Sequence, residues 1–240
     1  MRHGQTSGNS NRLVEGITDT PLNENGLSQA KLAGEWLQDE TFDIVYTSTL
    51  KRAKQTASII VDKNTNIDKN DKNFIELALL RERDFGVLEG ISMTEHTAIA
   101  AKEGLSWLEY TPEAAETLDD VKRRAESFLD RICGFALNSK NETSKALVVT
   151  HGFVIAHLIQ LIYEQTNCEG VPIDVIKNGW SIAEDRTKML CIMQNTSITR
   201  FEIEVDETTL KIDSAKCVLF KSSVHFKRIC VNLGYNFECF

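Results

Sequence analysis

The chain has 240 residues, of which 42% are hydrophobic and 26% charged, so it is long enough to bury a substantial core. Its formal net charge of −8 argues against general binding to nucleic acid or to an anionic membrane surface. Its apolar runs fall far short of the roughly 20 residues that span a bilayer, so we expect no membrane span. The six cysteines form no CxxC pair, and neither a signal peptide nor a Gly/Ser-rich linker is visible. We therefore expect a single domain over residues 1–240 in a cytoplasmic protein.

Helices and strands alternate along the predicted chain. In order they are a helix that follows a turn at Asn25-Gly26, a strand at 43–48, a helix at 50–60, a polar connector at 61–73, a long helix at 118–136, a strand at 146–150 with a helix after it, and strands at 188–194, 198–205 and 216–220. Apolar residues recur at helical spacing in the helices, and the strands are short and rich in β-formers. This alternation predicts an α/β fold, a three-layer α/β/α sandwich around a mostly parallel central sheet.

Four groups of polar residues carry candidate chemistry: Arg2-His3-Gly4, Arg52, Glu82 and His151. Phosphoryl transfer needs a nucleophile, cations around the phosphoryl oxygens and an acid for the departing oxygen. A neutral imidazole can be the nucleophile, and guanidinium groups bind phosphate oxygens in pairs. Each group alone has an ordinary structural interpretation, such as a turn or a solvated surface charge. We assign only structural roles to His96, His157 and His225.

The combination of these groups with their surroundings is far more specific. The relevant stretches are RHGQTSGN (2–9), GITDTPLNENGLSQA (16–30), TSTLKRAKQTA (47–57), LRERDFGVLEG (80–90), ETLDDVKRR (116–124), VVTHG (148–152) and NTSI (195–198). In their type and order they resemble the histidine phosphatase superfamily, in its phosphoglycerate-mutase-like branch. NTSI corresponds to a loop near the active site of that family.

The resemblance implies a role for each of the polar groups. His3 is the nucleophile that becomes phosphorylated, and Arg2, Arg52 and His151 clamp the transferring phosphoryl group. Glu82 protonates the leaving group and later acts as the base for the attacking water.

Two further residues, Asn9 and Gly16, are implied to line the phosphate or substrate pocket. The family chemistry requires no metal and no other cofactor. The implied partner is a small phosphorylated sugar, and protein partners are not indicated.

Within the superfamily, the R-E-R segment, residues 112–122 and the tail 230–236 resemble fructose-2,6-bisphosphatases most. This implies hydrolysis of fructose 2,6-bisphosphate to fructose 6-phosphate and a lowering of glycolytic flux. It is also compatible with nuclear or mitochondrial association. The alternatives are a broad-specificity phosphomonoesterase or bisphosphoglycerate phosphatase, and a catalytically impaired interaction protein. One departure is Ala114-Ala115, which stands where the family usually has a pair of glycines.

The start of the chain raises a separate expectation. Only Met1 precedes Arg2, whereas in the family Arg-His-Gly ends the first, central strand, and strands typically have about 5–6 residues. We expect this central strand to be truncated at the N-terminus and an apolar strand to lie upstream in the full-length protein. Loss of the strand is the reason for considering an impaired, non-catalytic protein.

Overall fold

The structure is a computed structural model in which residues 1–67, 73–166, 168–169 and 194–222 are described. The helices and strands are α1 (Ser7–Ser10), α2 (Glu24–Trp36), β1 (Ile44–Ser48), α3 (Lys51–Lys63), β2 (Phe74–Leu77), the short 3-10 helices η2 (Ala78–Leu80) and η3 (Gly86–Leu88), α4 (Met93–Lys102), α5 (Leu118–Asn138), β3 (Ala146–Val149), α6 (Gly152–Thr166), β4 (Ile198–Val205) and β5 (Ile212–Ser222). Among the residues described, none of the helices has the length and hydrophobicity of a membrane span.

The strands form two groups. A parallel three-stranded sheet has the order β2-β1-β3, with Val45 of β1 aligned with Phe74 on one side and Leu147 on the other. Strands β4 and β5 form an antiparallel pair. Between β3 and the residue before β4 lies the start of the chain, where Arg2 makes a parallel bridge to Thr150.

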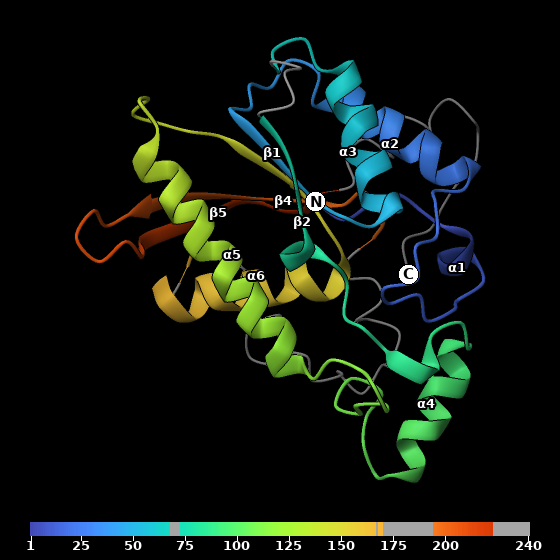
Figure 1. Ribbon diagram of the computed structural model, residues 1–240. Helices are drawn as coiled ribbons and strands as arrows, with labels where there is room; N and C mark the ends of the chain where they lie inside the picture. The colour runs from blue at the N-terminus through green and yellow to red at the C-terminus, as the bar shows by residue number, and fades with distance from the viewer. Residues whose placement is uncertain (68–72, 167, 170–193, 223–240) are drawn as a thin grey trace.

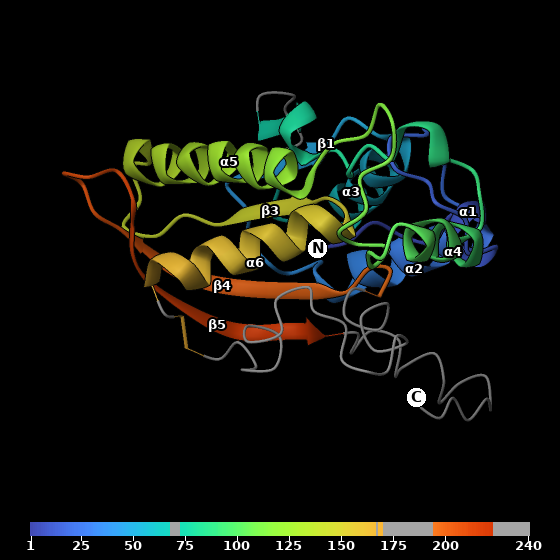
Figure 2. The same cartoon turned by 90° about the horizontal axis from the view of Figure 1, so that it is seen from below.

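Helices cover both faces of this sheet, as the side chains of β1 show. Val45 belongs to a core cluster that contains Ala53 and Ile60 of α3. Its neighbour Tyr46 points to the other face and belongs to a cluster with Phe128 of α5. Figures 1 and 2 show α2 beside α3, and α5 and α6 as a second pair of neighbouring helices. The predicted three-layer α/β fold with a mostly parallel sheet is confirmed.

The first residues lie in the interior of the molecule, where Figure 1 marks the N-terminus. The Met1 amine donates to Val148 O at 2.9 Å, and Thr150 N donates to Met1 O at 2.9 Å. On the other side Arg2 N donates to Ser197 O at 3.1 Å. The Arg-His-Gly motif therefore continues the hydrogen-bond pattern of β3 at the position where the sequence predicts the end of a central strand.

The sequence-based prediction was wrong at Asn25-Gly26, which do not form a turn. They lie in the first turn of α2, which starts at Glu24 because the Asn23 side chain caps it by accepting from Gly26 N at 2.8 Å. Glycine is required there by close packing, since a Cβ on residue 26 would lie 2.0 Å from Gln5 O.

Other differences concern the extent and number of elements. Strand β2 and helix α4 were not predicted, and α3 runs on to Lys63, into the expected connector. The strand predicted at 198–205 is confirmed as β4, and the one at 216–220 lies within the longer β5. The strand predicted at 188–194, His225 and the tail 230–236 lie wholly or almost wholly outside the described residues.

Candidate active site

Two buried histidines, His3 and His151, face each other at the end of β3. His3 N donates to Thr150 O at 3.0 Å, so the two histidines follow adjacent backbone segments that run in parallel. Their ring centroids are 4.9 Å apart and their planes are inclined by 55°. The pair predicted from two motifs 148 positions apart is therefore brought into direct contact by strand pairing.

The hydrogen bond of His3 selects one tautomer of its ring. Its Nδ1 lies 2.7 Å from Gly4 O, and a carbonyl oxygen can only accept, so Nδ1 carries the hydrogen. The lone pair is then on Nε2. Burial, followed by the positive charges of Arg52 and Arg2, holds the pKa of His3 well below its usual range. His3 is therefore a neutral imidazole at physiological pH, which is the form that can act as a nucleophile.

His151 is equally buried and lies directly before α6. Burial and the nearby Arg52 hold its pKa well below the usual value. Neither ring nitrogen has a hydrogen-bond partner among the described residues. Buried polar groups are almost always hydrogen-bonded, so this ring is suited to donate to a bound oxyanion.

Two arginines flank the histidines, of which Arg52 is buried and Arg2 is half-buried. Arg52, from the first turn of α3, donates through Nη1 to Thr18 O at 2.7 Å and through Nη2 to Gly16 O at 2.6 Å. These bonds fix the guanidinium plane, and within the described part of the chain its buried Nε has no partner. Arg2 is held by its own backbone bonds, beside His3. Arginine keeps its charge even where burial lowers its pKa, as it does for both residues.

The loop that holds Arg52 depends on Gly16 and Glu89. Gly16 has φ +47°, and a Cβ there would lie 2.0 Å from Glu89 Oε1. Glu89 Oε1 accepts from Ile17 N at 2.7 Å and Oε2 accepts from Thr18 N at 2.8 Å. Gly16 thus lies at the predicted site, where its carbonyl orients Arg52. Its direct contact with substrate stays a prediction.

Glu82 approaches from the segment between η2 and η3. Its Oε1 accepts from Arg83 N at 3.0 Å and from Phe153 N, in the first turn of α6, at 3.2 Å. Oε2 would lie 3.7 Å from a Cβ on Gly152, the residue after His151. Burial raises the pKa of Glu82, against the opposing effect of Arg52 and Arg2. This carboxyl group can therefore hold a proton for a leaving oxygen.

Asn9 is placed at the site through other side chains. Its Nδ2 donates to Glu15 Oε2 at 2.7 Å, and its Oδ1 accepts from Asn195 Nδ2 at 2.9 Å. Asn195 also donates to His3 O at 3.1 Å, which confirms that the NTSI segment lies at the site. A substrate contact by Asn9 stays a prediction.

Sequence reasoning missed several charged residues next to these groups, among them Glu15 and Arg124. Glu15 holds Asn9 and accepts from Thr6 Oγ1 at 2.7 Å, yet it follows the first motif without matching it. Arg124 lies at the end of ETLDDVKRR, a motif that carries the family resemblance but to which the sequence alone assigns no role. That motif was the available signal.

Comparison with known proteins agrees with this geometry. The family model of the histidine phosphatase superfamily (branch 1) matches residues 1–183. The fructose-2,6-bisphosphatase TIGAR B of Danio rerio is 31% identical, over 95% of this chain and 95% of its own. The probable fructose-2,6-bisphosphatase TIGAR A of the same species is 29% identical, over 95% and 96%. The solved structure of Bacillus stearothermophilus YhfR is 27% identical and superposes with a TM-score of 0.68, over 93% of this chain and 96% of that one. The chain therefore belongs to branch 1 of the histidine phosphatase superfamily, and its enzymatic class is that of a phosphoric monoester hydrolase.

Proposed function

We propose that the protein hydrolyses the 2-phosphate of fructose 2,6-bisphosphate through a phosphohistidine at His3. The observation that carries the proposal is the contact of two buried, neutral histidines between the buried Arg52 and the half-buried Arg2, with a protonatable carboxyl group beside them. The two relatives named as fructose-2,6-bisphosphatases support the choice of substrate. Removal of this bisphosphate would lower glycolytic flux.

In the first half-reaction the Nε2 lone pair of His3 attacks phosphorus while the bond from phosphorus to the sugar oxygen breaks. The fixed guanidinium of Arg52, together with Arg2, balances the charge on the phosphoryl oxygens. His151 donates to one of these oxygens. Glu82 gives its proton to the departing sugar oxygen, and fructose 6-phosphate leaves.

In the second half-reaction water replaces the sugar. Glu82, now a carboxylate, takes a proton from the water, whose oxygen attacks the phosphohistidine. The bond from phosphorus to Nε2 breaks, and its electron pair returns to the imidazole of His3. Inorganic phosphate leaves, and both the histidine and the protonated carboxyl group are regenerated.

The site also explains how a chain with a net charge of −8 can bind an anion. Arg52 is buried and Arg2 is half-buried, so their two positive charges lie in a weakly screened environment, where they act more strongly than surface charges. The acidic remainder of the protein is exposed to water and salt, which screen it.

The test is phosphate release from a panel of esters, with fructose 2,6-bisphosphate, 2,3-bisphosphoglycerate and simple monophosphates compared by kcat/KM. We expect the fructose ester to rank first and His3→Gln to abolish both turnover and ³²P labelling. The matched control is His157→Gln, a buried histidine whose Nδ1 lies 2.8 Å from Phe153 O within α6. Equal kcat/KM across the panel would instead indicate a broad-specificity phosphomonoesterase, and turnover by His3→Gln would rule out the mechanism.

We also propose a cytoplasmic location. The support is that Cys133, Cys168 and Cys217 are free thiols in the described structure, as in proteins of reducing compartments. Fractionation of the endogenous protein tests this, and recovery from an oxidising compartment would contradict it.

A further inference from the structure

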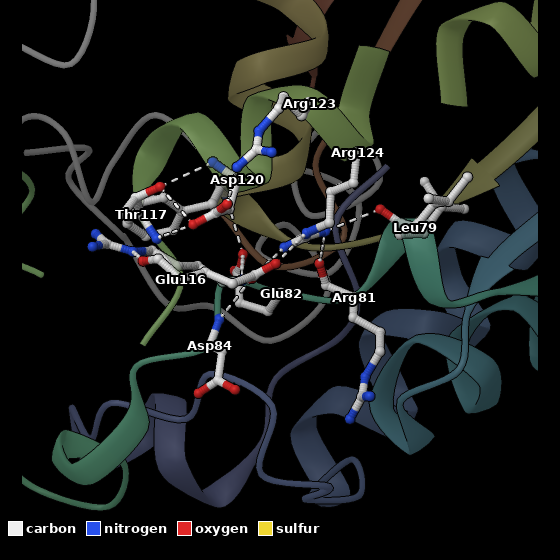
Figure 3. A network of polar contacts seen from close by, with 12 residues as sticks. Leu79, Arg81, Glu82, Asp84, Glu116, Thr117, Asp120, Arg123 and Arg124 are labelled. Carbon is white, nitrogen blue, oxygen red and sulfur yellow. Dashed lines mark hydrogen bonds and ion pairs between the residues drawn. The ribbon is translucent and has the colours of Figure 1, made fainter. Parts of the chain in front are cut away.

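The mechanism leaves Arg124 and Glu116, the two ends of the ETLDDVKRR motif, without a role. Figure 3 shows both near Glu82, with Arg124 reaching from α5 toward the backbone that carries the acid. Glu116 lies in the segment that precedes α5. Both side chains are largely withdrawn from water, with 13% of Arg124 and 28% of Glu116 exposed.

Arg124 holds the backbone on the N-terminal side of Glu82. Its Nη1 donates to Leu79 O at 2.9 Å and to Arg81 O. The second of these carbonyls belongs to the peptide bond that joins residue 81 to Glu82. Arg124 therefore fixes the direction from which the backbone approaches Glu82.

Glu116 holds the backbone on the C-terminal side. Its Oε2 accepts from Asp84 N at 3.0 Å, and its own amide donates to Asp84 O at 3.0 Å. Glu116 also binds Arg124 through both carboxylate oxygens, at 2.9 Å from Nε and 3.0 Å from Nη2. The two-point ion pair thus closes a bridge over Glu82, from residue 81 to residue 84.

We propose that Arg124 and Glu116 form a positioning pair, which fixes the backbone on both sides of Glu82 and sets the charge that its carboxyl group faces. This rests on the proposed function, in which Glu82 is the proton donor. Neither residue touches the reacting atoms in this proposal. A bidentate arginine-carboxylate pair suits such a task because its planar geometry allows only one relative orientation.

The charge around Glu82 comes from several elements. Arg2 at the start of the chain, Arg52 of α3 and Arg124 of α5 each favour the carboxylate and so lower its pKa. Arg83, the next residue, interacts with both Glu82 and Glu116, and His151 lies before the first turn of α6. Burial opposes the arginines and is the larger effect. Removing Arg124 therefore raises the pKa of Glu82 further. Removing the negative charge of Glu116 leaves the positive charge of Arg124 less neutralised, and this lowers the pKa of Glu82.

The experiment compares Arg124→Gln, Arg124→Lys and Glu116→Gln in the full chain. The control is Arg123→Gln, which makes the same change one position earlier on α5, where an exposed arginine pairs with Asp120. We expect Arg124→Gln to lower kcat about 10- to 100-fold, the size typical of a displaced catalytic group, with KM for fructose 2,6-bisphosphate unchanged. Its activity at alkaline pH should persist to higher pH, because a protonated Glu82 is lost only above its raised pKa.

The other variants separate charge from geometry. Arg124→Lys should restore the alkaline limb of the pH profile but not kcat, since lysine keeps the charge and loses the two-point geometry. Glu116→Gln should move the limb to lower pH, opposite to Arg124→Gln. Arg123→Gln should behave as wild type. Wild-type kcat and pH profile in Arg124→Gln, or limbs that move in the same direction in both variants, would overturn the proposal.

A second readout does not need turnover. The carboxyl group of Glu82 can be titrated by ¹³C NMR, assigned by its loss in Glu82→Gln, and should show the same opposite shifts in Arg124→Gln and Glu116→Gln. If the pKa of Glu82 shifts as expected but wild type releases phosphate from no ester, the proposed function is wrong and the effect of the pair on Glu82 still holds. Phosphate release by wild type, with no shift in either variant, would sink the pair alone.

Discussion

The histidine side and the acid side of the site are held by different kinds of bonds. On the histidine side, His3 and His151 are placed by backbone pairing, in which residues 1–3 bond to residues 148–150. On the acid side, Glu82 lies in a segment without regular pairing. Arginine side chains hold it, Arg124 from α5 and Arg83 from its own segment.

This difference determines how each side responds to change. Backbone hydrogen bonds between paired segments do not depend on the identity of most side chains. They are disrupted when an added atom pushes the paired segments apart, so the histidine side is sensitive to larger side chains at closely packed positions. A side-chain clamp fails when one guanidinium is removed, because several buried carbonyl oxygens then lose their donor at once. The predictions below test this contrast.

The largest expected effect is on the acid itself. Glu82→Gln removes the proposed proton donor and should lower kcat about 10²- to 10⁴-fold, the usual contribution of a general acid. Phosphorylation of His3 by a substrate with an acidic leaving group should be affected less, because such a group departs without a proton. Single-turnover ³²P labelling with an alkyl and an aryl phosphate measures this. Equal losses for both would contradict the assigned role.

The same variant has a defined effect on stability. The pKa of Glu82 in the folded protein is raised above the ordinary value of 4.5. At pH values between these two pKa values, the folded protein therefore keeps a proton on Glu82 that the unfolded chain has released. Stability is therefore lost as pH rises through the folded pKa. Glutamine does not titrate, so Glu82→Gln should lose less stability between acid and alkaline pH than wild type. Urea unfolding across this range tests the sign.

The second prediction concerns Arg83, the clamp of the acid side. Its buried guanidinium donates to Leu108 O, Tyr110 O, Glu116 O and Thr111 Oγ1 at 2.8–3.3 Å. Arg83→Met leaves these acceptors without their donor and should reduce the free energy of unfolding by about 2–4 kcal/mol. The control Arg123→Met, in a side chain that is 73% exposed, should change it by less than about 0.5 kcal/mol. Equal unfolding midpoints would show that the clamp is dispensable.

The contrast also explains what the sequence could predict. A short apolar strand that ends just before His151 predicts a ligand site at the carboxyl edge of the sheet. For His3, which only Met1 and Arg2 precede, the family resemblance supplied the expected strand end. The acid side gave no such pattern, because Arg83 and Arg124 look like members of surface charge runs until tertiary structure buries them. Strand β2 was missed for a related reason, as it lies at the sheet edge and is only partly buried. The turn expected at Asn25-Gly26 failed because the glycine serves packing instead of backbone conformation.

The third prediction adds one methyl group to the histidine side. A Cβ on residue 26 would lie 2.0 Å from Gln5 O, two residues after His3. Gly26→Ala should therefore cost about 1–3 kcal/mol of stability, as overpacking does, and should also lower kcat/KM by moving His3. In α5, where a Cβ on Gly134 would contact nothing within 4 Å, Gly134→Ala should stabilise by about 0.5–1 kcal/mol. Thermal unfolding of both variants measures the two effects. An unchanged melting temperature in Gly26→Ala would contradict the expected sensitivity of the histidine side to added atoms.

The smallest effect is expected at Ala114, where the sequence departs from the expected pair of glycines. Its φ of +58° lies in the left-handed region, which disfavours any side chain with a Cβ. Ala114→Gly removes this strain but gives the unfolded chain more freedom, so the net gain should be about 0.5–1 kcal/mol in the free energy of unfolding. Ala115→Gly, whose backbone is outside that region, should destabilise by a similar amount. The loop packs on Gly86, four residues after Glu82, and Ala114→Gly adds no atom to this contact. We therefore expect ³²P labelling of His3 to stay unchanged in Ala114→Gly. Urea unfolding measures both free energies. If Ala115→Gly is more stable than Ala114→Gly, the backbone at Ala114 is not strained.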